Sequence, residues 1–146
     1  RKKKLKKFLF ATHGTLAAGA KSTLELLIGN VADITCLTAY VNPDDNVDEQ
    51  LKAYFSEVSD EDQVIVCTDL MGGSVNQKIV PNAQKKNVFL IAGFNLPLLL
   101  ELAMNEDKVT EEELLDSIEE SRKNMMLVRV EVTDSGTEKE EEEFLA

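Results

Sequence analysis

Cysteine and histidine are scarce in this chain of 146 residues, which contains two cysteines, one histidine and no tryptophan. Cys36 and Cys67 both lie in apolar runs, where a thiol packs as a small hydrophobic side chain, so we expect free, buried thiols typical of a cytoplasmic protein. A disulfide between them is less favoured. A metal site made from the two cysteines and the single histidine, His13, is poorer still, and we expect no metal.

Long hydrophobic runs are also missing. No run reaches the length of a membrane span, so we expect no direct membrane insertion. The basic start at residues 1–7 and the apolar run at residues 8–11 resemble the beginning of a signal peptide. This apolar run is shorter than the roughly seven to fifteen residues that a secretory core needs, and we therefore expect no export and a cytoplasmic location.

Basic residues are few outside the first seven positions. Residues 1–7 hold six of the sixteen lysines and arginines, and the rest of the chain carries 10 basic and 27 acidic residues, a net charge of −17. Such a surface repels phosphate backbones, so we expect no nucleic acid partner. Residues 138–143 hold five acids and one lysine, and we interpret residues 136–146 as a solvated acidic tail. Residues 1–135 have the length of one ordinary domain.

Apolar runs alternate with segments of helical period along this domain. Four runs predict strands, at residues 8–11, 34–39, 64–67 and 88–92. Continuous apolar runs are typical of strands covered by helices on both faces of a parallel sheet. The segments between them predict helices whose apolar faces are Leu16, Ala20, Leu24, Leu27 and Ile28 in the first and Val47, Leu51, Tyr54, Phe55 and Val58 in the second.

Capping residues and a proline indicate where the predicted helices begin and end. Asn46 with Glu49 predicts a capping box for the second helix. Two more helices are expected at the end of the series, one over residues 96–104 and one that starts at Thr110, is capped by Glu113 and buries Leu114, Leu115 and Ile118. Between them and the second helix, a helix begins near Ser74, and Pro81 should end or kink it.

The predicted fold is an open, doubly wound α/β domain with helices on both faces of a mainly parallel sheet of strand order 2-1-3-4. Residues 127–133 differ from the other strands because valines alternate with polar side chains. This alternation is typical of a half-buried strand, and we expect an antiparallel edge strand there.

Ligands of such sheets bind beyond the carboxyl ends of the strands, where the strand order reverses. Thr12, His13 and Gly14 follow the first strand, and residues 68–74 follow the third. We therefore expect His13 and Asp69 to meet, although 56 positions separate them. An aspartate that accepts the N–H of one ring nitrogen fixes the tautomer and leaves the other nitrogen as a nucleophile.

A glycine-rich turn follows this aspartate. Gly72, Gly73 and Ser74 at the start of a helix can aim several backbone N–H groups at one anion, helped by the helix dipole. A nucleophilic imidazole, its carboxylate and an anion cradle suit a phosphoryl group held on His13. Alternative interpretations are a histidine that is only a cap or a satisfied surface residue, and a Gly-Gly pair that only makes a tight turn. A Ser-His-Asp hydrolase would use Ser74, but no G-x-S-x-G elbow is present.

The segment that follows His13 looks like a P-loop with one extra residue. Gly14 and Gly19 have the required spacing, but Ala20 stands before Lys21. On a helix this insertion rotates Lys21 by about 100°, away from any β- or γ-phosphate. We interpret the segment as a helix N-terminus next to the histidine, and we expect no nucleotide cofactor.

Three segments together resemble a known family. Phe10–Gly14, Thr68–Gln77 and Ile91–Glu101 are similar, in order and spacing, to the enzyme IIA domain of the mannose/fructose/sorbose family of the bacterial phosphoenolpyruvate-dependent sugar phosphotransferase system. The resemblance covers roughly residues 6–133 and depends on the THG, D-x-x-GGS and G-x-N-L-P motifs in series. One departure is Val75, where many members have proline after the GGS.

The resemblance implies that His13 accepts a phosphoryl group from the phosphocarrier HPr and passes it to an enzyme IIB domain. It implies that Asp69 supports the ring, and that the phosphate is received at Gly72, Gly73 and Ser74. Asn95 would lie near the same site, beside Thr12 and Gly14. The family is usually a homodimer with an exchanged C-terminal strand, which would explain residues 127–133, and it works with a membrane permease.

Three other functions fit the same residues. A related phosphohistidine domain feeds a dihydroxyacetone kinase instead of an enzyme IIB domain. A regulatory domain would use phosphorylated His13 only to signal to a partner. A plain structural α/β module would need the THG and GGS motifs only as turns, and it explains least because three motifs agree on one predicted site.

Overall fold

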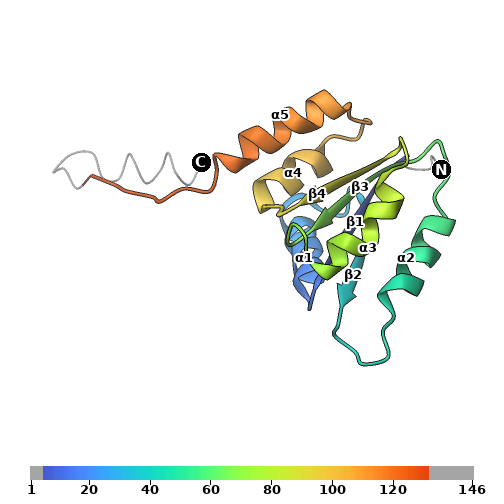
Figure 1. Ribbon diagram of the computed structural model, residues 1–146. Helices are drawn as coiled ribbons and strands as arrows, with labels where there is room; N and C mark the ends of the chain where they lie inside the picture. The colour runs from blue at the N-terminus through green and yellow to red at the C-terminus, as the bar shows by residue number, and fades with distance from the viewer. Residues whose placement is uncertain (1–4, 132–146) are drawn as a thin grey trace.

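Four parallel strands form a single sheet of order β2-β1-β3-β4 in the computed structural model, which describes residues 5–131 (Figure 1). The strands are β1 (Lys6–His13), β2 (Asp33–Ala39), β3 (Gln63–Thr68) and β4 (Val88–Ala92). Five helices alternate with them or follow them: α1 (Leu16–Ile28), α2 (Val47–Ser56), α3 (Ser74–Ala83), α4 (Leu96–Met104) and α5 (Glu111–Arg122). The predicted α/β class and 2-1-3-4 strand order are confirmed.

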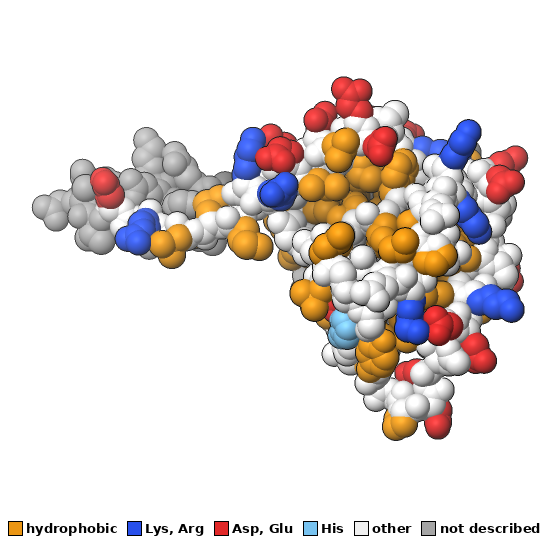
Figure 2. Space-filling view, viewed as in Figure 1, with side chains coloured by type: hydrophobic (Ala, Val, Ile, Leu, Met, Phe, Trp, Pro, Cys, Tyr) orange, Lys and Arg blue, Asp and Glu red, His pale blue; other side chains and the backbone are white. Residues whose placement is uncertain are grey.

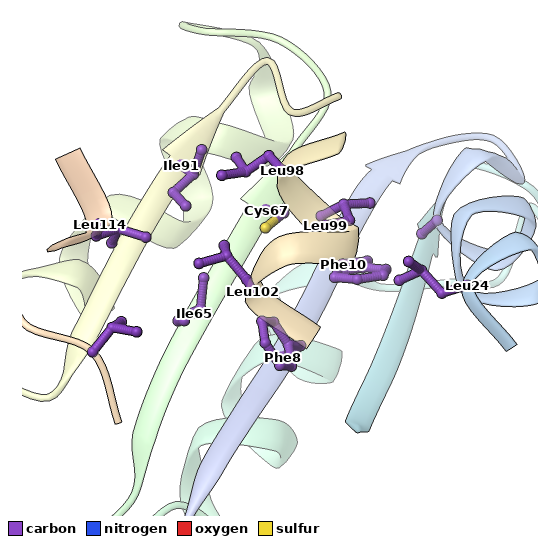
Figure 3. Packing of buried hydrophobic residues seen from close by; sticks show 12 residues of the cluster. Phe8, Phe10, Leu24, Ile65, Cys67, Ile91, Leu98, Leu99, Leu102 and Leu114 are labelled. Carbon is purple, nitrogen blue, oxygen red and sulfur yellow. The ribbon is translucent and has the colours of Figure 1, made fainter. Parts of the chain in front are cut away.

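The sheet is covered on both faces because successive side chains of each strand point to opposite sides. Phe8 and Phe10 of β1 belong to a buried cluster that α1, α4 and α5 complete through Leu24, Leu98, Leu99, Leu102 and Leu114 (Figure 3). Leu9 and Ala11 point the other way, into a cluster closed by α2 and α3 with Val47, Leu51, Phe55, Val75 and Ile79. Each large apolar side chain buried in this way stabilises the fold by about 1.5–3 kcal/mol.

Side chains mark where several helices begin. Asn46 accepts a hydrogen bond from the Glu49 backbone N–H at 3.1 Å, and Asn95 accepts one from Leu98 at 3.0 Å. Thr110 and Glu113 form the reciprocal capping box predicted for α5. Each such cap contributes about 1 kcal/mol to helix stability.

The buried stripe of α1 is narrower than the sequence predicts. Leu24 is buried, whereas Leu16 and Leu27 are 52% and 55% exposed. On a helix these two residues lie about 80° and 60° around the axis from Leu24, at the margin of the stripe that faces the sheet. Ala17, about 20° from Leu24, is buried in their place. Leu115 of α5 is likewise exposed, so its predicted burial is wrong.

Pro81 interrupts α3 less than the sequence predicts. The helix passes through Pro81 and ends at Ala83. Because Pro81 lies in the last turn, its missing N–H removes a single bond at the end of the ladder.

Both cysteines are free thiols. Cys67 is fully buried, and burial raises the pKa of its thiol to about 12. Cys36 is only half-buried, and burial also raises its pKa. Within residues 5–131, no helix combines the length and the hydropathy needed to cross a bilayer.

The chain after α5 differs from the sequence prediction. Residues 127–131 form no strand, and this segment leads away from the body of the domain (Figure 1). A segment with alternating valines becomes a strand only when another strand pairs with it, and no edge of this sheet lies beside it (Figure 1). Val132, Thr133 and the acidic tail predicted over residues 136–146 lie outside the described residues.

Candidate functional site

The carboxyl edge of the two central strands brings one histidine and one aspartate together. His13 is the last residue of β1, and Asp69 directly follows β3, its parallel neighbour. The backbone nitrogen of His13 donates a hydrogen bond to Asp69 Oδ2 at 2.8 Å, and ring nitrogen Nδ1 lies 2.9 Å from the same oxygen. One carboxylate oxygen therefore fixes both the backbone and the ring of His13.

These two contacts determine which ring nitrogen is free. An ionised carboxylate only accepts hydrogen bonds, so Nδ1 must carry the proton that it shares with Asp69. In the neutral ring the lone pair then lies on Nε2, the nitrogen on the opposite side. The His13 side chain is 39% exposed and that of Asp69 is 12% exposed, so a partner can reach the ring but not the carboxylate.

The charge state of Asp69 results from opposing effects. Burial raises the pKa of this carboxyl, but the hydrogen bonds from the His13 backbone and ring, together with the charge of the ring, outweigh it and lower the pKa below its usual value. The other oxygen, Oδ1, is buried and has no hydrogen-bond partner among residues 5–131. Asp69 is therefore ionised at neutral pH, with its hydrogen bonding concentrated on Oδ2.

The turn that leads into α3 lies against the imidazole. Gly72 has a φ of 74°, a left-handed conformation that a glycine adopts without strain. A Cβ on Gly73 would lie 3.4 Å from His13 Cε1, at the near limit of van der Waals contact, so the backbone of the turn lies close to the ring. Ser74 begins α3, and its Oγ lies 3.4 Å from His13 Nε2. The first N–H groups of α3 have no partner inside the helix and are available to an anion.

Tyr40 is a further neighbour that the sequence interpretation missed. Its hydroxyl lies 2.8 Å from Ser74 Oγ, and its ring centroid lies 5.6 Å from that of His13. Tyr40 follows Ala39, which pairs with His13 across the sheet. The rule that led to His13 and Asp69, to examine the residues directly after neighbouring strands, would also have found it.

Two polar side chains of α3 brace this turn, and sequence reasoning assigned a role to neither of them. The Gln77 amide donates to the Gly72 carbonyl at 3.0 Å. Asn76 is buried, and its Oδ1 accepts a hydrogen bond from Thr68 Oγ1 at 2.9 Å, at the end of β3. Both bonds connect α3 to the segment that carries Asp69.

The residues predicted to flank the site have structural contacts. Thr12 is fully buried, and its Oγ1 accepts the Ala17 N–H at 2.8 Å, which anchors the start of α1. Gly14 has a φ of 58° and donates its N–H to the Ala39 carbonyl at 2.9 Å. Asn95 caps α4 and donates to the Ser121 carbonyl at 2.7 Å.

Asn95 lies near the site without reaching the ring. It lines a cavity of about 390 Å³ together with Asp69, and the rest of its wall comes from Leu16, Gly19, Ala20, Thr23, Phe94, Leu96 and Leu99. This cavity places the start of α4 beside the carboxylate.

The segment that resembles a P-loop is helical. Gly19, Ala20 and Lys21 all lie inside α1, which begins at Leu16. No glycine loop is therefore left to wrap a phosphate. Among residues 5–131, no group of three or more histidine, cysteine or carboxylate side chains is arranged to hold a metal ion.

The imidazole lies at the surface beside hydrophobic side chains (Figure 2). Four exposed apolar residues belong to the segments that build the site: Leu16, Tyr40, Leu70 and Met71. Apolar side chains exposed around a reactive group are typical of a protein-docking surface.

Comparisons with known proteins agree on one family. The model of the PTS system fructose IIA component matches residues 7–119. A solved structure from Klebsiella pneumoniae, described as a phosphoenolpyruvate-dependent sugar phosphotransferase system (PTS) permease, is 28% identical with a TM-score of 0.76, covering 87% of this chain and 94% of that one. A PTS IIA protein associated with the fucose utilization operon of Streptococcus pneumoniae is 29% identical with a TM-score of 0.70, covering 84% and 92%.

A third solved structure is similar in fold. The mannose/sorbose specific IIA subunit of Enterococcus faecalis is 20% identical with a TM-score of 0.73, covering 87% of this chain and 98% of that one. No curated protein matches the chain. Because the family model covers residues 7–119, well over half of the sequence, this chain belongs to the PTS system fructose IIA component family and is a component of a sugar phosphotransferase system.

Proposed function

We propose that His13 carries a phosphoryl group, which it accepts from the phosphocarrier HPr and passes to an enzyme IIB domain for sugar uptake and phosphorylation. The observation that carries this proposal is the position of Asp69 Oδ2, 2.8 Å from the His13 backbone nitrogen and 2.9 Å from Nδ1. An oxygen held in this way keeps Nδ1 as a donor and leaves Nε2 as the nucleophile. Membership of the family supports phosphotransferase activity in general, and this geometry supports His13 as its centre.

The phosphoryl transfer to His13 needs no reactant other than the phosphorylated donor protein. The Nε2 lone pair attacks the phosphorus of the phosphorylated donor, a bond forms between Nε2 and phosphorus, and the donor's bond to the phosphoryl group breaks with its electron pair. The ring then carries a positive charge, with a proton on Nδ1 and the phosphoryl group on Nε2, and the Asp69 carboxylate stabilises that charge. Attack by the IIB nucleophile on the same phosphorus reverses these changes.

The turn beside the ring stabilises the phosphoryl group. Phosphoryl transfer depends mainly on alignment and on stabilising charge over the equatorial oxygens. The glycine turn at Gly72 and Gly73, the Ser74 hydroxyl and the first N–H groups of α3 would supply hydrogen bonds to those oxygens, and the helix dipole favours the same charge. In this proposal Thr12, Gly14 and Asn95 hold the surrounding backbone and contribute no reacting atom.

The partners are proteins. Leu16, Leu70 and Met71, which are exposed on the segments that build the site, would pack against HPr and the IIB domain in turn. We also propose a cytoplasmic homodimer that associates with a membrane permease, and its interface would include the exposed segment after α5. That segment presents the side chains of Met125, Met126, Leu127 and Val128.

Intact-mass measurement tests the proposal. Wild type and His13→Ala are incubated with phosphoenolpyruvate, enzyme I and HPr, and HPr is shown to be phosphorylated in both mixtures. We expect an acid-labile phosphoryl adduct on wild type alone. An equal adduct on both proteins, or none on either, would contradict the assignment of His13.

Adding a second acceptor then separates the alternatives. Loss of the adduct when an enzyme IIB domain is added supports transport. Loss only to a dihydroxyacetone kinase subunit would favour the related kinase system, and an adduct that passes to neither would favour a regulatory domain.

A further inference from the structure

Tyr40 occupies an unusual place beside His13. It follows the last residue of β2, at the same sheet edge as the histidine. Its φ of 64° is the one positive value of a non-glycine residue within residues 5–131. A bulky side chain in this left-handed region is strained, so the surrounding contacts must hold it there.

Two contacts connect Tyr40 to the site. Its ring lies 5.6 Å from the imidazole, tilted by 32°, and its hydroxyl oxygen lies 2.8 Å from Ser74 Oγ. Ser74 Oγ in turn lies 3.4 Å from His13 Nε2. Gly73 stands at the cap position of α3, and Ser74 is the first residue of the helix, with its Oγ in contact with Tyr40 and His13.

We infer that Tyr40 is a positioning residue for phosphoryl transfer, because its hydroxyl donates to Ser74 Oγ and thereby directs the single Ser74 proton toward the group on Nε2. This inference rests on the proposed function of His13. A serine hydroxyl has one proton. If Ser74 donated that proton to Tyr40, it would present only lone pairs to the phosphoryl oxygens, which are acceptors as well. A bound phosphoryl group therefore selects the arrangement in which Tyr40 donates.

The position of the ring adds to this effect. Tyr40 is 55% exposed, so a partner that docks over His13 also covers the tyrosine. Removal of water strengthens the hydrogen bonds that remain in the site. The Tyr40–Ser74 bond would thus contribute most when donor or acceptor protein is bound.

The chain contains two tyrosines, and the second supplies a matched control. The hydroxyl of Tyr54 is buried and has no hydrogen-bond partner among residues 5–131. Tyr40→Phe and Tyr54→Phe each remove one hydroxyl and keep the ring, but only the first change removes a bond to Ser74.

Single-turnover transfer from phosphorylated HPr gives the main test. We expect Tyr40→Phe to slow transfer roughly five- to tenfold, the loss of one neutral hydrogen bond, and Tyr54→Phe to stay within about twofold of wild type. In a Ser74→Ala background, Tyr40→Phe should cost less than about twofold, because its partner is gone. Equal rates for Tyr40→Phe and wild type, or the same loss with and without Ser74, would overturn the inference.

A second measurement covers the case in which Ser74→Ala is too slow to compare. The ³¹P chemical shift of the phosphohistidine should move in Tyr40→Phe and remain at the wild-type value in Tyr54→Phe. Unfolding midpoints recorded for each variant separate a change at the site from a change in folding. Absence of any adduct on wild type would refute the proposed function itself, whereas normal charging with an unchanged Tyr40→Phe would refute only the role of Tyr40.

Discussion

Replacement of Asp69 by asparagine separates two effects of the carboxylate on His13, its hydrogen bonding and its negative charge. Asparagine has nearly the same shape, and its amide oxygen can take the position of Oδ2. That position faces the His13 backbone N–H at 2.8 Å, which is only ever a donor, so the oxygen is preferred there over the amide nitrogen. Nδ1 then keeps its proton and Nε2 keeps its lone pair. Only the negative charge is lost.

The expected reduction in transfer rate follows from the loss of this negative charge alone. A hydrogen bond to a charged group contributes about 1.5–3 kcal/mol, and one between neutral groups contributes about 0.5–1.5 kcal/mol. The difference of about 1–2 kcal/mol is felt when the ring becomes cationic in the transfer. Asp69→Asn should therefore slow phosphoryl transfer roughly 5- to 30-fold, since about 1.4 kcal/mol corresponds to a factor of ten.

Rapid-quench measurement of transfer from phosphorylated HPr gives the rate. Asp116→Asn, which changes an exposed aspartate of α5 by the same charge, controls for altered attraction of the partner and should leave the rate within about twofold. The amide group that replaces the buried Oδ1 has no partner among residues 5–131, so unfolding midpoints are recorded and rates are compared below them. A rate equal to wild type would refute the role of the charge. A loss of about ten-thousandfold would show that the tautomer is wrong, and would refute the anchoring by the backbone.

Two further predictions concern the turn and the pH dependence. Gly72→Ala should destabilise the fold by about 1–2 kcal/mol in urea unfolding, because its φ of 74° is strained for any residue with a Cβ, and an unchanged midpoint would contradict this. Because the pKa of Asp69 is lowered in the folded state, its ionisation contributes stability at neutral pH that is lost as the pH falls through its folded pKa. The stability difference between wild type and Asp69→Asn should therefore shrink below about pH 4, and a difference that is constant with pH would exclude this linkage.

The sheet could be predicted because each strand is indicated by an apolar run within its own few residues. The runs that contain Phe8 and Phe10 on one face and Leu9 and Ala11 on the other are apolar at every position, which only a strand covered on both sides requires. The handedness of the crossovers then limits the strand order. The exposed faces of helices were less predictable: Leu16 has the right spacing for the core of α1 but lies at the margin of the contact with the sheet.

The meeting of His13 and Asp69 could be expected from the same topology, since each directly follows one of two neighbouring strands. Tyr40 directly follows β2, so the same rule would have named it, although its left-handed backbone could not be predicted from the sequence. The contacts of Asn76 and Gln77 depend on the direction of their side chains, which no sequence pattern indicates. A strand at residues 127–133 would need the edge of another strand to pair with. The alternation of valines does not indicate whether such an edge is present.

The helix beginnings of this domain suggest why the glycine turn has the sequence that it has. Asn46, Asn95 and Thr110 accept N–H groups at the starts of α2, α4 and α5, and Thr12 serves α1 in the same way. Among the helices of the described chain, only α3 begins with no side-chain acceptor, because glycine stands at its cap position. A cap there would contribute about 1 kcal/mol, but its oxygen would occupy one of the first N–H groups of α3, the helix that begins at Ser74 beside the imidazole. In the proposed cycle the phosphoryl oxygens would take the place of that missing cap. A helix left uncapped in the free protein would then become capped each time His13 is phosphorylated.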